Sequence, residues 1–202
     1  MITVVDYGAY HAQAVAQALK RLTSDETVTV STDPEVILQS DGVIVPGGGV
    51  CAVAMRGIQR NGLRDVLWQT SLRGVPLLGI GLGMHVLFSE SEEHGLHRGL
   101  NLLPGCVEKL PVPHVGWNAL AIAQAHPLLA GLAGQIVYFS HTYGATVANY
   151  DETLAIADDG GGIVAAVGRH PVYGVQFHPE KSGAAGKRLL ENFVSMCRKE
   201  RK

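Results

Sequence analysis

The sequence predicts an α/β fold with a mainly parallel sheet. Short and almost continuously apolar runs alternate with segments of helical periodicity in the first half of the chain, and a glycine follows each run closely. Strands of this kind are buried on both faces, as parallel strands are when helices cover both sides of a sheet. The βαβα order predicts right-handed crossovers between the strands.

Three such runs predict the strands of the first half: Ile2–Val5, Gly42–Val45 and Val75–Ile80. Apolar residues at helical spacing predict the helices of this half: Ala12–Leu22, Ala52–Arg60, Leu63–Leu72 and a shorter one after Gly83. The second half is richer in strands, which we expect at Val115–Ile122, Gln135–Tyr143, Thr153–Ala157, Ile163–Val167 and Val172–Phe177. Composition predicts a turn at Asp158–Gly162, and helical spacing predicts a final helix at Ala184–Lys199.

The 202 residues contain no linker, repeat or low-complexity tract, so we expect one domain over residues 1–202. Apolar residues make up 47% of the chain and charged residues 17%, which is the balance of an ordinary globular protein. The net charge of −2 gives no footprint for nucleic acid or a membrane surface, so neither is expected as a partner. The basic run Arg198–Lys202 is interpreted as the solvated end of the last helix.

The chain opens on a strand and has no basic, apolar leader, so no signal peptide is expected. No apolar stretch reaches the roughly 20 residues of a membrane-spanning helix. The cysteines Cys51, Cys106 and Cys197 are odd in number and far apart, which predicts neither a disulfide framework nor a CxxC metal site. These features predict a cytoplasmic protein.

The segment from Pro76 to His85 joins a strand to a helix through three alternate glycines, Gly79, Gly81 and Gly83. This is the spacing of a nucleophile elbow, in which the outer glycines let strand and helix backbones pass closely. The central residue of such an elbow lies beside helix N–H groups that can stabilise an oxyanion. Because Gly81 is that residue, the sequence predicts the frame of a catalytic site without its nucleophile. The alternative is a plain glycine-rich turn, and the spacing does not match a dinucleotide loop.

Beyond the elbow at Gly79–Met84, an ordered series of motifs extends across almost the whole chain. It includes the glycine loop Val45–Gly49 and the segment Gly174–Ser182, which reads Gly-Val-Gln-Phe-His-Pro-Glu-Lys-Ser. The other members are Asp6–Gly8, Ser91–Glu93, Pro104–Gly105, Pro113–Asn118 and Tyr138–Tyr143. The set resembles the class I glutamine amidotransferases and, through Pro113–Asn118 in particular, their branch of imidazole glycerol phosphate synthase glutaminase subunits.

The resemblance implies a single flavodoxin-like α/β domain in which added antiparallel strands extend a mostly parallel central sheet. In that family a cysteine thiolate attacks the side-chain amide of glutamine, ammonia leaves, and water hydrolyses the glutamyl thioester. The ammonia passes to a (β/α)8-barrel cyclase, so the resemblance implies a heterodimer that acts in histidine biosynthesis. It implies no cofactor.

Carried over by motif, His178 is the base that activates the thiol, Glu180 orients that histidine, and Gly81 occupies the position of the nucleophile. The resemblance implies that oxyanion N–H groups and a glutamine pocket are supplied by Gly47, Gly48, Gly49, Leu82, His85, Glu93, Thr142 and Tyr143. It implies that Tyr138 and Lys181 lie towards the partner protein.

The sequence departs from the family pattern at four places, all on loops that surround one pocket in the resembling fold. Gly81 replaces the cysteine, His85 replaces a glutamine, Gly48 replaces a valine, and Ala9–His11 replaces a small residue followed by Gly and Asn. Since glycine cannot form a thioester, we expect no glutaminase activity by the ordinary route.

Several histidines could also meet Cys51 at the position of the family's active site, which we call the old site: His11, His85, His141 and His178. None has a recognised ligand spacing such as H-x-x-x-H, so we expect no metal site. Cys51 as a relocated nucleophile is a further alternative, but it follows the glycine loop, whereas reactive thiols favour a helix N-terminus or a nearby cation. Cys106 and Cys197 are interpreted as packing residues.

Two classes of function therefore stay open. The chain is either the glutaminase subunit of an imidazole glycerol phosphate synthase, in a form that lacks its cysteine, or a non-catalytic pseudo-glutaminase. The second would bind or regulate a cyclase-like barrel that uses free ammonia.

Overall fold

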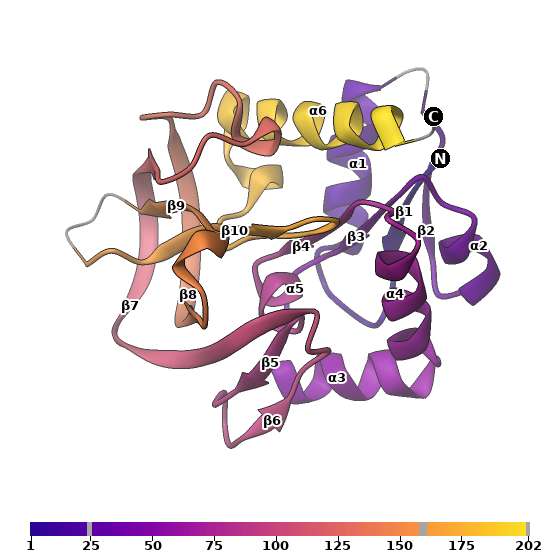
Figure 1. Cartoon of the computed structure of the whole chain (residues 1–202), viewed down its shortest axis with the longest axis horizontal. Helices are drawn as coiled ribbons and strands as arrows, with labels where there is room; N and C mark the ends of the chain where they lie inside the picture. The colour runs from indigo at the N-terminus through magenta and orange to yellow at the C-terminus, as the bar shows by residue number, and fades with distance from the viewer. Residues whose placement is uncertain (24–25, 158–160, 201–202) are drawn as a thin grey trace.

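The computed structural model describes residues 1–23, 26–157 and 161–200 (Figure 1). Part of the turn expected at Asp158–Gly162 and the last two residues of the basic run Arg198–Lys202 lie outside the described residues. Within the described ranges, no helix is both long enough and apolar enough to cross a bilayer.

A run of parallel strands, in the order β2–β1–β3–β4–β11, forms the centre of the sheet. These strands are β1 Ile2–Val5, β2 Val28–Ser31, β3 Gly42–Val45, β4 Leu77–Ile80 and β11 Val172–Val175. Each residue of β1, β3, β4 and β11 is buried. The continuous apolar runs of the sequence therefore are strands covered on both faces.

Further strands extend this sheet beyond β11, in the order β10–β9–β7–β5–β6, and β8 pairs with β7. They are β5 Phe88–Ser91, β6 His97–Arg98, β7 Leu103–Ile122, β8 Ile136–Val147, β9 Thr153–Ala157 and β10 Val164–Arg169. The pairs are antiparallel except for β5 with β7. The predicted architecture, a mostly parallel central sheet with added antiparallel strands, is confirmed.

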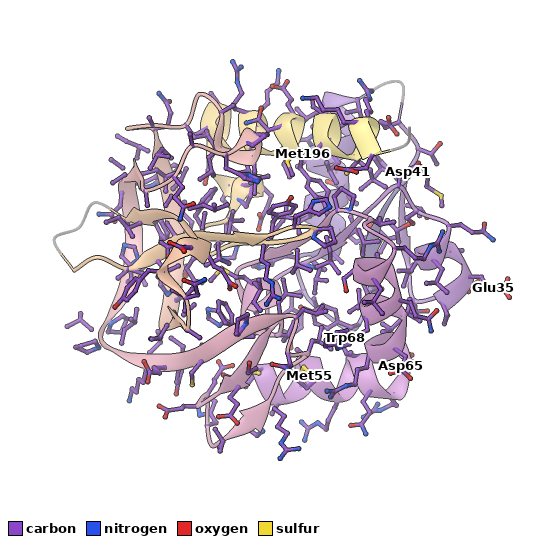
Figure 2. All side chains as sticks on the ribbon, viewed as in Figure 1. Glu35, Asp41, Met55, Asp65, Trp68 and Met196 are labelled. Carbon is purple, nitrogen blue, oxygen red and sulfur yellow. The ribbon has the colours of Figure 1, made fainter. Side chains whose placement is uncertain are left out.

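Helices cover both faces of the parallel strands (Figure 1). One layer holds α1 Ala12–Leu22 and α6 Gly183–Glu200, and the other holds α2 Pro34–Leu38, α3 Cys51–Arg60 and α4 Leu63–Leu72. The alternation of side chains along a strand separates the two cores, because Ile44 of β3 packs in the first layer and Val43 and Val45 pack in the second. Figure 2 shows Met196 on the side of α6 and Trp68 on the side of α4.

Several short elements were not expected from the sequence. Among them are β2 and α2, which lie between α1 and β3, and the pair β5 and β6. Strand β2 is at the edge of the sheet and only its first residue is buried, so it lacks the continuous apolar run of the inner strands. The expected strand Val75–Ile80 begins only at Leu77.

Strand β7 also begins twelve residues before the expected start at Val115. The sequence predicted a later start because the first half of the strand contains prolines, which favour a loop interpretation. Its pairing with β8 is interrupted between Lys109 and His114, and Pro111 and Pro113 lie in that interruption. Proline lacks a backbone N–H but is tolerated where the ladder is irregular, so one long strand can contain both residues.

The parallel strands bring four loops to one edge of the sheet. The carboxyl ends of β1, β3, β4 and β11 all point to that edge, and they are followed by residues 6–11, 46–50, 81 and 176–180. Ligands of open α/β sheets bind at this edge. The fold therefore gathers four of the eight sequence motifs at one place.

Gly83 tests the closeness of this packing. A β-carbon on Gly83 would lie 1.9 Å from the Val45 carbonyl oxygen, so Gly83→Ala requires the backbone to shift. We expect this variant to lower the free energy of unfolding by about 1–3 kcal/mol, as overpacking does elsewhere. Urea denaturation measures the change. The control is Ser195→Ala on the exposed side of α6, which should stay within about 0.5 kcal/mol, and a Gly83→Ala midpoint equal to this control would contradict the packing.

Candidate active site

The turn between β4 and α5 Leu82–His85 has the backbone of an elbow. Gly81 has φ 55° and ψ −116°, a conformation that costs little for glycine and is strained for other residues. Its N–H donates to the Val175 carbonyl at 2.8 Å, and its own carbonyl accepts from Met84 and His85 at 3.0 and 3.2 Å. The elbow is thus held by backbone hydrogen bonds and does not depend on a side chain at position 81.

His178 lies directly beside the elbow. A β-carbon built on Gly81 would be 3.3 Å from Cε1 of His178 and 3.7 Å from its Nε2. The structure therefore brings these two residues together, as the family resemblance implied, although their motifs are far apart in the chain. A short side chain at position 81 would contact the imidazole ring.

Glu180, on the short 3-10 turn η3 Pro179–Lys181, supports the other side of that ring. Its Oε1 is 3.0 Å from Nδ1 of His178, and its side chain is only 3% exposed. Burial acts to raise the pKa of the Glu180 carboxyl, but the hydrogen bond and positive charge of His178, with a contribution from His11, outweigh burial and hold the pKa below its usual value. An ionised Glu180 accepts from Nδ1–H of His178, so a neutral ring presents an unprotonated Nε2 to Gly81.

The main chain of His178 is anchored to β8. Its N–H donates to the Tyr138 carbonyl at 2.9 Å, and its carbonyl accepts from the hydroxyl of Ser182 at 2.6 Å. The same hydroxyl accepts from the N–H of Tyr138 at 3.0 Å. His178 is therefore oriented by a network that is independent of residue 81.

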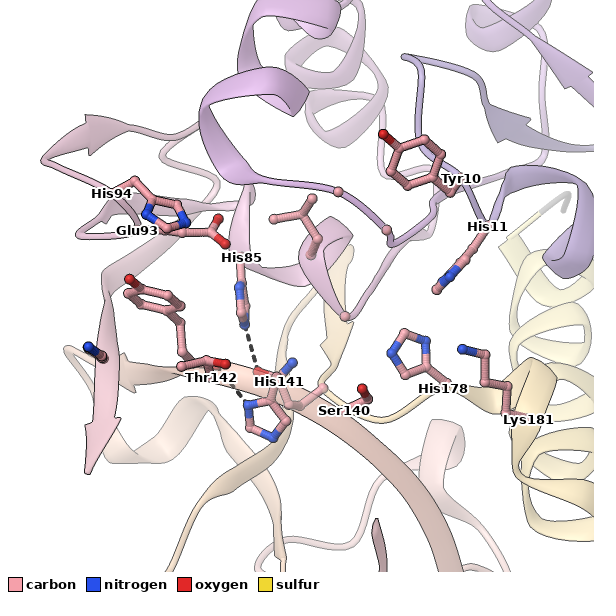
Figure 3. Close-up of a pocket in the computed structure, with 17 residues that line it drawn as sticks. Tyr10, His11, His85, Glu93, His94, Ser140, His141, Thr142, His178 and Lys181 are labelled. Carbon is pink, nitrogen blue, oxygen red and sulfur yellow. Dashed lines mark hydrogen bonds between the residues drawn. The ribbon is translucent and has the colours of Figure 1, made fainter. Parts of the chain in front are cut away.

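A pocket of about 570 Å³ opens in front of Gly81 and His178. Figure 3 shows His178 and Lys181 at one end of it and Glu93 and His94 at the other. The residues expected from the sequence that line it are Gly48, Gly49, Gly81, Leu82, His85, Glu93, Thr142, Tyr143, His178 and Lys181. The lining also includes residues that were given no role from the sequence: Lys109, His94, Ser140 and Gln176.

Three of the expected site residues are outside this lining. Gly47 packs under the elbow, where a β-carbon would be 2.8 Å from the Ile80 carbonyl oxygen. Glu180 lies behind His178 and contacts the pocket through it. Tyr138 is half-buried on the outer face of β8, with the ammonium nitrogen of Lys181 5.9 Å from its ring centre.

Glu93 and Cys51 contact each other at the start of α3. The Cys51 N–H donates to Oε2 of Glu93 at 2.6 Å, and the Cys51 side chain is completely buried. The expected start of this helix at Ala52 was one residue late, so Cys51 does lie at a helix N-terminus. Burial nevertheless raises the pKa of the Cys51 thiol, and the negative charge of Glu93 raises it further. A hydrogen bond with the Ser91 side chain acts to lower it. Cys51 is also not a lining residue, which argues against it as a relocated nucleophile.

Two histidines of the pocket are kept uncharged at neutral pH. Burial lowers the pKa of His85 to about 4, although Nε2 of His85 hydrogen-bonds Oε1 of Gln176 at 2.7 Å. Burial also lowers the pKa of His141 to about 4, against the effect of its hydrogen bond to the Tyr143 carbonyl. Both hydrogen bonds are drawn in Figure 3. His85 and His141 therefore act as neutral polar groups in the wall.

His11 approaches His178 from the loop between β1 and α1. Their ring centres are 5.2 Å apart, and Nδ1 of His11 is 3.5 Å from Oε1 of Glu180. Burial lowers the pKa of His11, and Glu180 only partly offsets that effect. Of the histidines expected at the old site, His11 and His178 are the two whose nitrogens lie close enough, together with Glu180, to share a metal ion.

Comparison with known proteins gives a consistent result. The family described as "Glutamine amidotransferase class-I" matches residues 3–197. Curated relatives named "Imidazole glycerol phosphate synthase subunit HisH" are similar over nearly the whole chain. The protein from Geobacillus sp. (strain WCH70) is 40% identical over 97% of each chain. The one from Streptococcus sanguinis (strain SK36) is 44% identical over 96% of this chain and 95% of its own, and the one from Methanothermobacter thermautotrophicus is 40% identical over 98% and 100%.

Solved structures with little sequence identity share the fold. A crystal structure of a glutamine amidotransferase has a TM-score of 0.76 at 21% identity and covers 97% of this chain and 98% of its own. The structure of PurLQS from Thermotoga maritima has a TM-score of 0.74 at 18% identity, with 96% of this chain and 97% of its own covered. These similarities support the α/β architecture alone.

The buried His85 generates a prediction about acid stability. The pKa of His85 is about 4 in the folded chain, whereas an unperturbed histidine, as in the unfolded chain, has a pKa of 6.5. As the pH falls, the unfolded chain therefore binds a proton before the folded chain does. The resulting stability is complete above about pH 6.5 and is lost towards pH 4. Between pH 7 and pH 4.5, this effect should lower the free energy of unfolding of the parent chain by about 2–3 kcal/mol. The His85→Gln variant should lack this part of the acid destabilisation.

Urea midpoints at the two pH values measure this difference. The matched control is His94→Gln, which removes an exposed histidine from the rim of the same pocket. Equal acid sensitivity of His85→Gln and the parent chain would show that His85 is not held neutral by burial.

Proposed function

The chain belongs to the class I glutamine amidotransferase family, and from that premise we propose that it is a glutaminase-silent subunit of an imidazole glycerol phosphate synthase. It would bind a (β/α)8-barrel cyclase that works with free ammonia. The proposal follows the relatives, which are named as subunits of this synthase, and departs from them in the chemistry of the elbow.

One observation carries the proposal: the elbow and the His178–Glu180 pair are assembled around a residue that has no side chain. The covalent route needs a thiolate at this position to attack the amide carbon and hold the glutamyl group as a thioester. His178 would be placed to take the proton of that thiol and to return it to the leaving ammonia. Without the sulfur, the histidine has no nucleophile to activate.

The oxyanion side of the site would remain usable. Leu82 begins α5, so its N–H has no partner inside the helix, and Leu82 lines the pocket together with Gly48 and Gly49. Glu93 lies at the far end of the pocket (Figure 3). Such a pocket supports binding of a glutamine-like ligand without turnover, and a regulatory role of this kind is the alternative within the proposal.

An exposed apolar patch on β7 and β8 supports the partner. Trp117 and Tyr138 are paired across the two strands with ring centres 5.5 Å apart, and Val115 and Ile136 belong to the same outer face. Trp117 and Ile136 are each 58% exposed and Val115 is 63% exposed. Val137 and Phe139, which alternate with them, are buried in the core. Large aromatic groups with Lys181 at their edge are typical of a protein interface.

The proposed function predicts the rate of ammonia release from glutamine. The chain as it stands should lack turnover, with a rate about a thousandfold or more below that of an enzyme with its nucleophile. Gly81→Cys should gain ammonia release because its β-carbon would contact His178. The strained φ of residue 81 should cost the variant about 1–3 kcal/mol in stability without unfolding it.

A coupled ammonia assay with the purified chain and its cyclase measures these rates. In the Gly81→Cys background, His178→Ala should lower the rate by about 100-fold, whereas Cys51→Ala should leave it unaltered. Substantial glutamine turnover by the parent chain would reject the proposal, and indifference of the Gly81→Cys variant to His178→Ala would reject the role of His178.

The exposed apolar patch on β7 and β8 generates a prediction about partner binding. Trp117→Ala should weaken binding of the cyclase by about 2 kcal/mol or more, because aromatic residues at the centre of an interface carry much of the binding energy. Lys181→Glu should also weaken it. Calorimetry with the cyclase from the same source measures both. Leu72→Ala, a 78% exposed apolar residue at the end of α4, is the control and should bind normally.

The outcomes separate the partner from its docking face. Failure of the parent chain to bind any cyclase would reject the partner. Normal binding by Trp117→Ala and Lys181→Glu would keep the partner and reject this surface.

A further inference from the structure

Three side chains converge beside one end of the pocket although none of them belongs to a metal-binding sequence motif. They are His11, from the loop after β1, and His178 and Glu180, from the segment after β11. Each offers one ligand atom, and all of these atoms lie within 4.8 Å of one another. Figure 3 shows the His11 ring pointing towards His178.

The separations match those of a tetrahedral metal site. Oε1 of Glu180 is 3.0 Å from Nδ1 of His178 and 3.5 Å from Nδ1 of His11. With zinc–nitrogen and zinc–oxygen bonds of about 2.0–2.2 Å, ligand atoms around a tetrahedral ion are about 3.3–3.6 Å apart. Small rotations of the side chains would therefore be enough to place one ion between them.

Two atoms of this cluster are buried without a hydrogen bond among the described residues. They are Nδ1 of His11 and Oε2 of Glu180. The Glu180 side chain is 3% exposed and the His178 side chain 8%, so solvent has little access to the carboxylate. Buried polar atoms are nearly always satisfied. A bound cation would satisfy Nδ1 of His11, and a carboxylate bound through both oxygens would also satisfy Oε2 of Glu180.

We propose that His11, His178 and Glu180 bind a divalent transition-metal ion of the zinc class, with a fourth coordination position left for water or another ligand. Two histidines and one glutamate form the ligand set of hydrolytic zinc sites that keep a position for water or another ligand. Imidazole nitrogen favours zinc, cobalt, nickel or copper over magnesium and calcium, which favour oxygen ligands.

His11 is the residue that makes this set possible. The resembling family has asparagine at this position, so the third ligand arrives with the same loop changes that accompany Gly81. The ion would take the Nδ1 of His178 that now pairs with Glu180, and thus the ring could not also act as the base of a thiol. Lys181 opposes the site, since its positive charge acts on His11, and Glu180 supplies the compensating negative charge.

The test uses the full chain without a histidine tag, stripped with a chelator and titrated with Co²⁺ alone. Visible absorption reports tetrahedral cobalt, and calorimetry with Zn²⁺ reports stoichiometry. One equivalent should bind with a tetrahedral spectrum. His11→Asn and, as a second variant, His11→Gln should weaken binding by more than the roughly 10–100-fold that loss of an outer partner costs in metal sites.

A second cluster on the surface, Glu92, Cys106 and Glu108, provides the matched control. Cys106→Ser should bind Co²⁺ like the parent chain, and circular dichroism should show that every variant is folded. No binding by the parent chain, or unaltered binding by both His11 variants, would overturn the proposal. Loss of binding in Cys106→Ser instead would assign the ion to the surface cluster and would overturn it equally. None of these outcomes depends on glutaminase activity or on a cyclase partner.

Discussion

The close approach of α5 to the carboxyl end of β3 is the contact on which the site depends. Gly83 lies against the Val45 carbonyl, and a β-carbon on Gly79 would be 2.5 Å from the Gly83 carbonyl oxygen. Because only glycine allows this spacing, the start of α5 is held directly above the strand ends. Leu82, Gly48 and His178 then line the same pocket.

This constraint acts through the main chain, which explains how the site geometry can persist without a nucleophile. Gly81 is held by its hydrogen bonds to Val175 and α5, and His178 by its hydrogen bonds to Tyr138 and Ser182. None of these interactions uses a side chain at position 81. The shape of the pocket therefore does not depend on the residue at position 81, and under the proposed function the pocket can bind a ligand without a covalent route.

Charge is unevenly distributed in the pocket. Burial keeps His85 and His141 neutral, whereas Glu180 is held ionised behind the wall by its histidine partners. A carboxylate that would orient one imidazole in the resembling family lies here within reach of two, His11 and His178. The same arrangement that would prepare a base for a thiol thus becomes, with His11 in place and no sulfur at Gly81, a set of ligands for a cation.

The sequence by itself determined the α/β class, the inner strands and the elbow, because buried parallel strands and the Gly79–Gly83 spacing have strong local patterns. Most of the lining residues were expected only through the family resemblance that the sequence motifs carry. It did not predict β2, whose exposed edge lacks such a pattern, or the full length of β7, whose prolines are accommodated by an irregular pairing with β8. Only the tertiary structure decided that Cys51 is buried away from the pocket and that His11 meets His178 and Glu180. The loops that carry His11, His178 and Glu180 follow strands that are distant in the chain. These side chains meet because the strand ends lie side by side in the folded sheet, and no spacing along the sequence could reveal it.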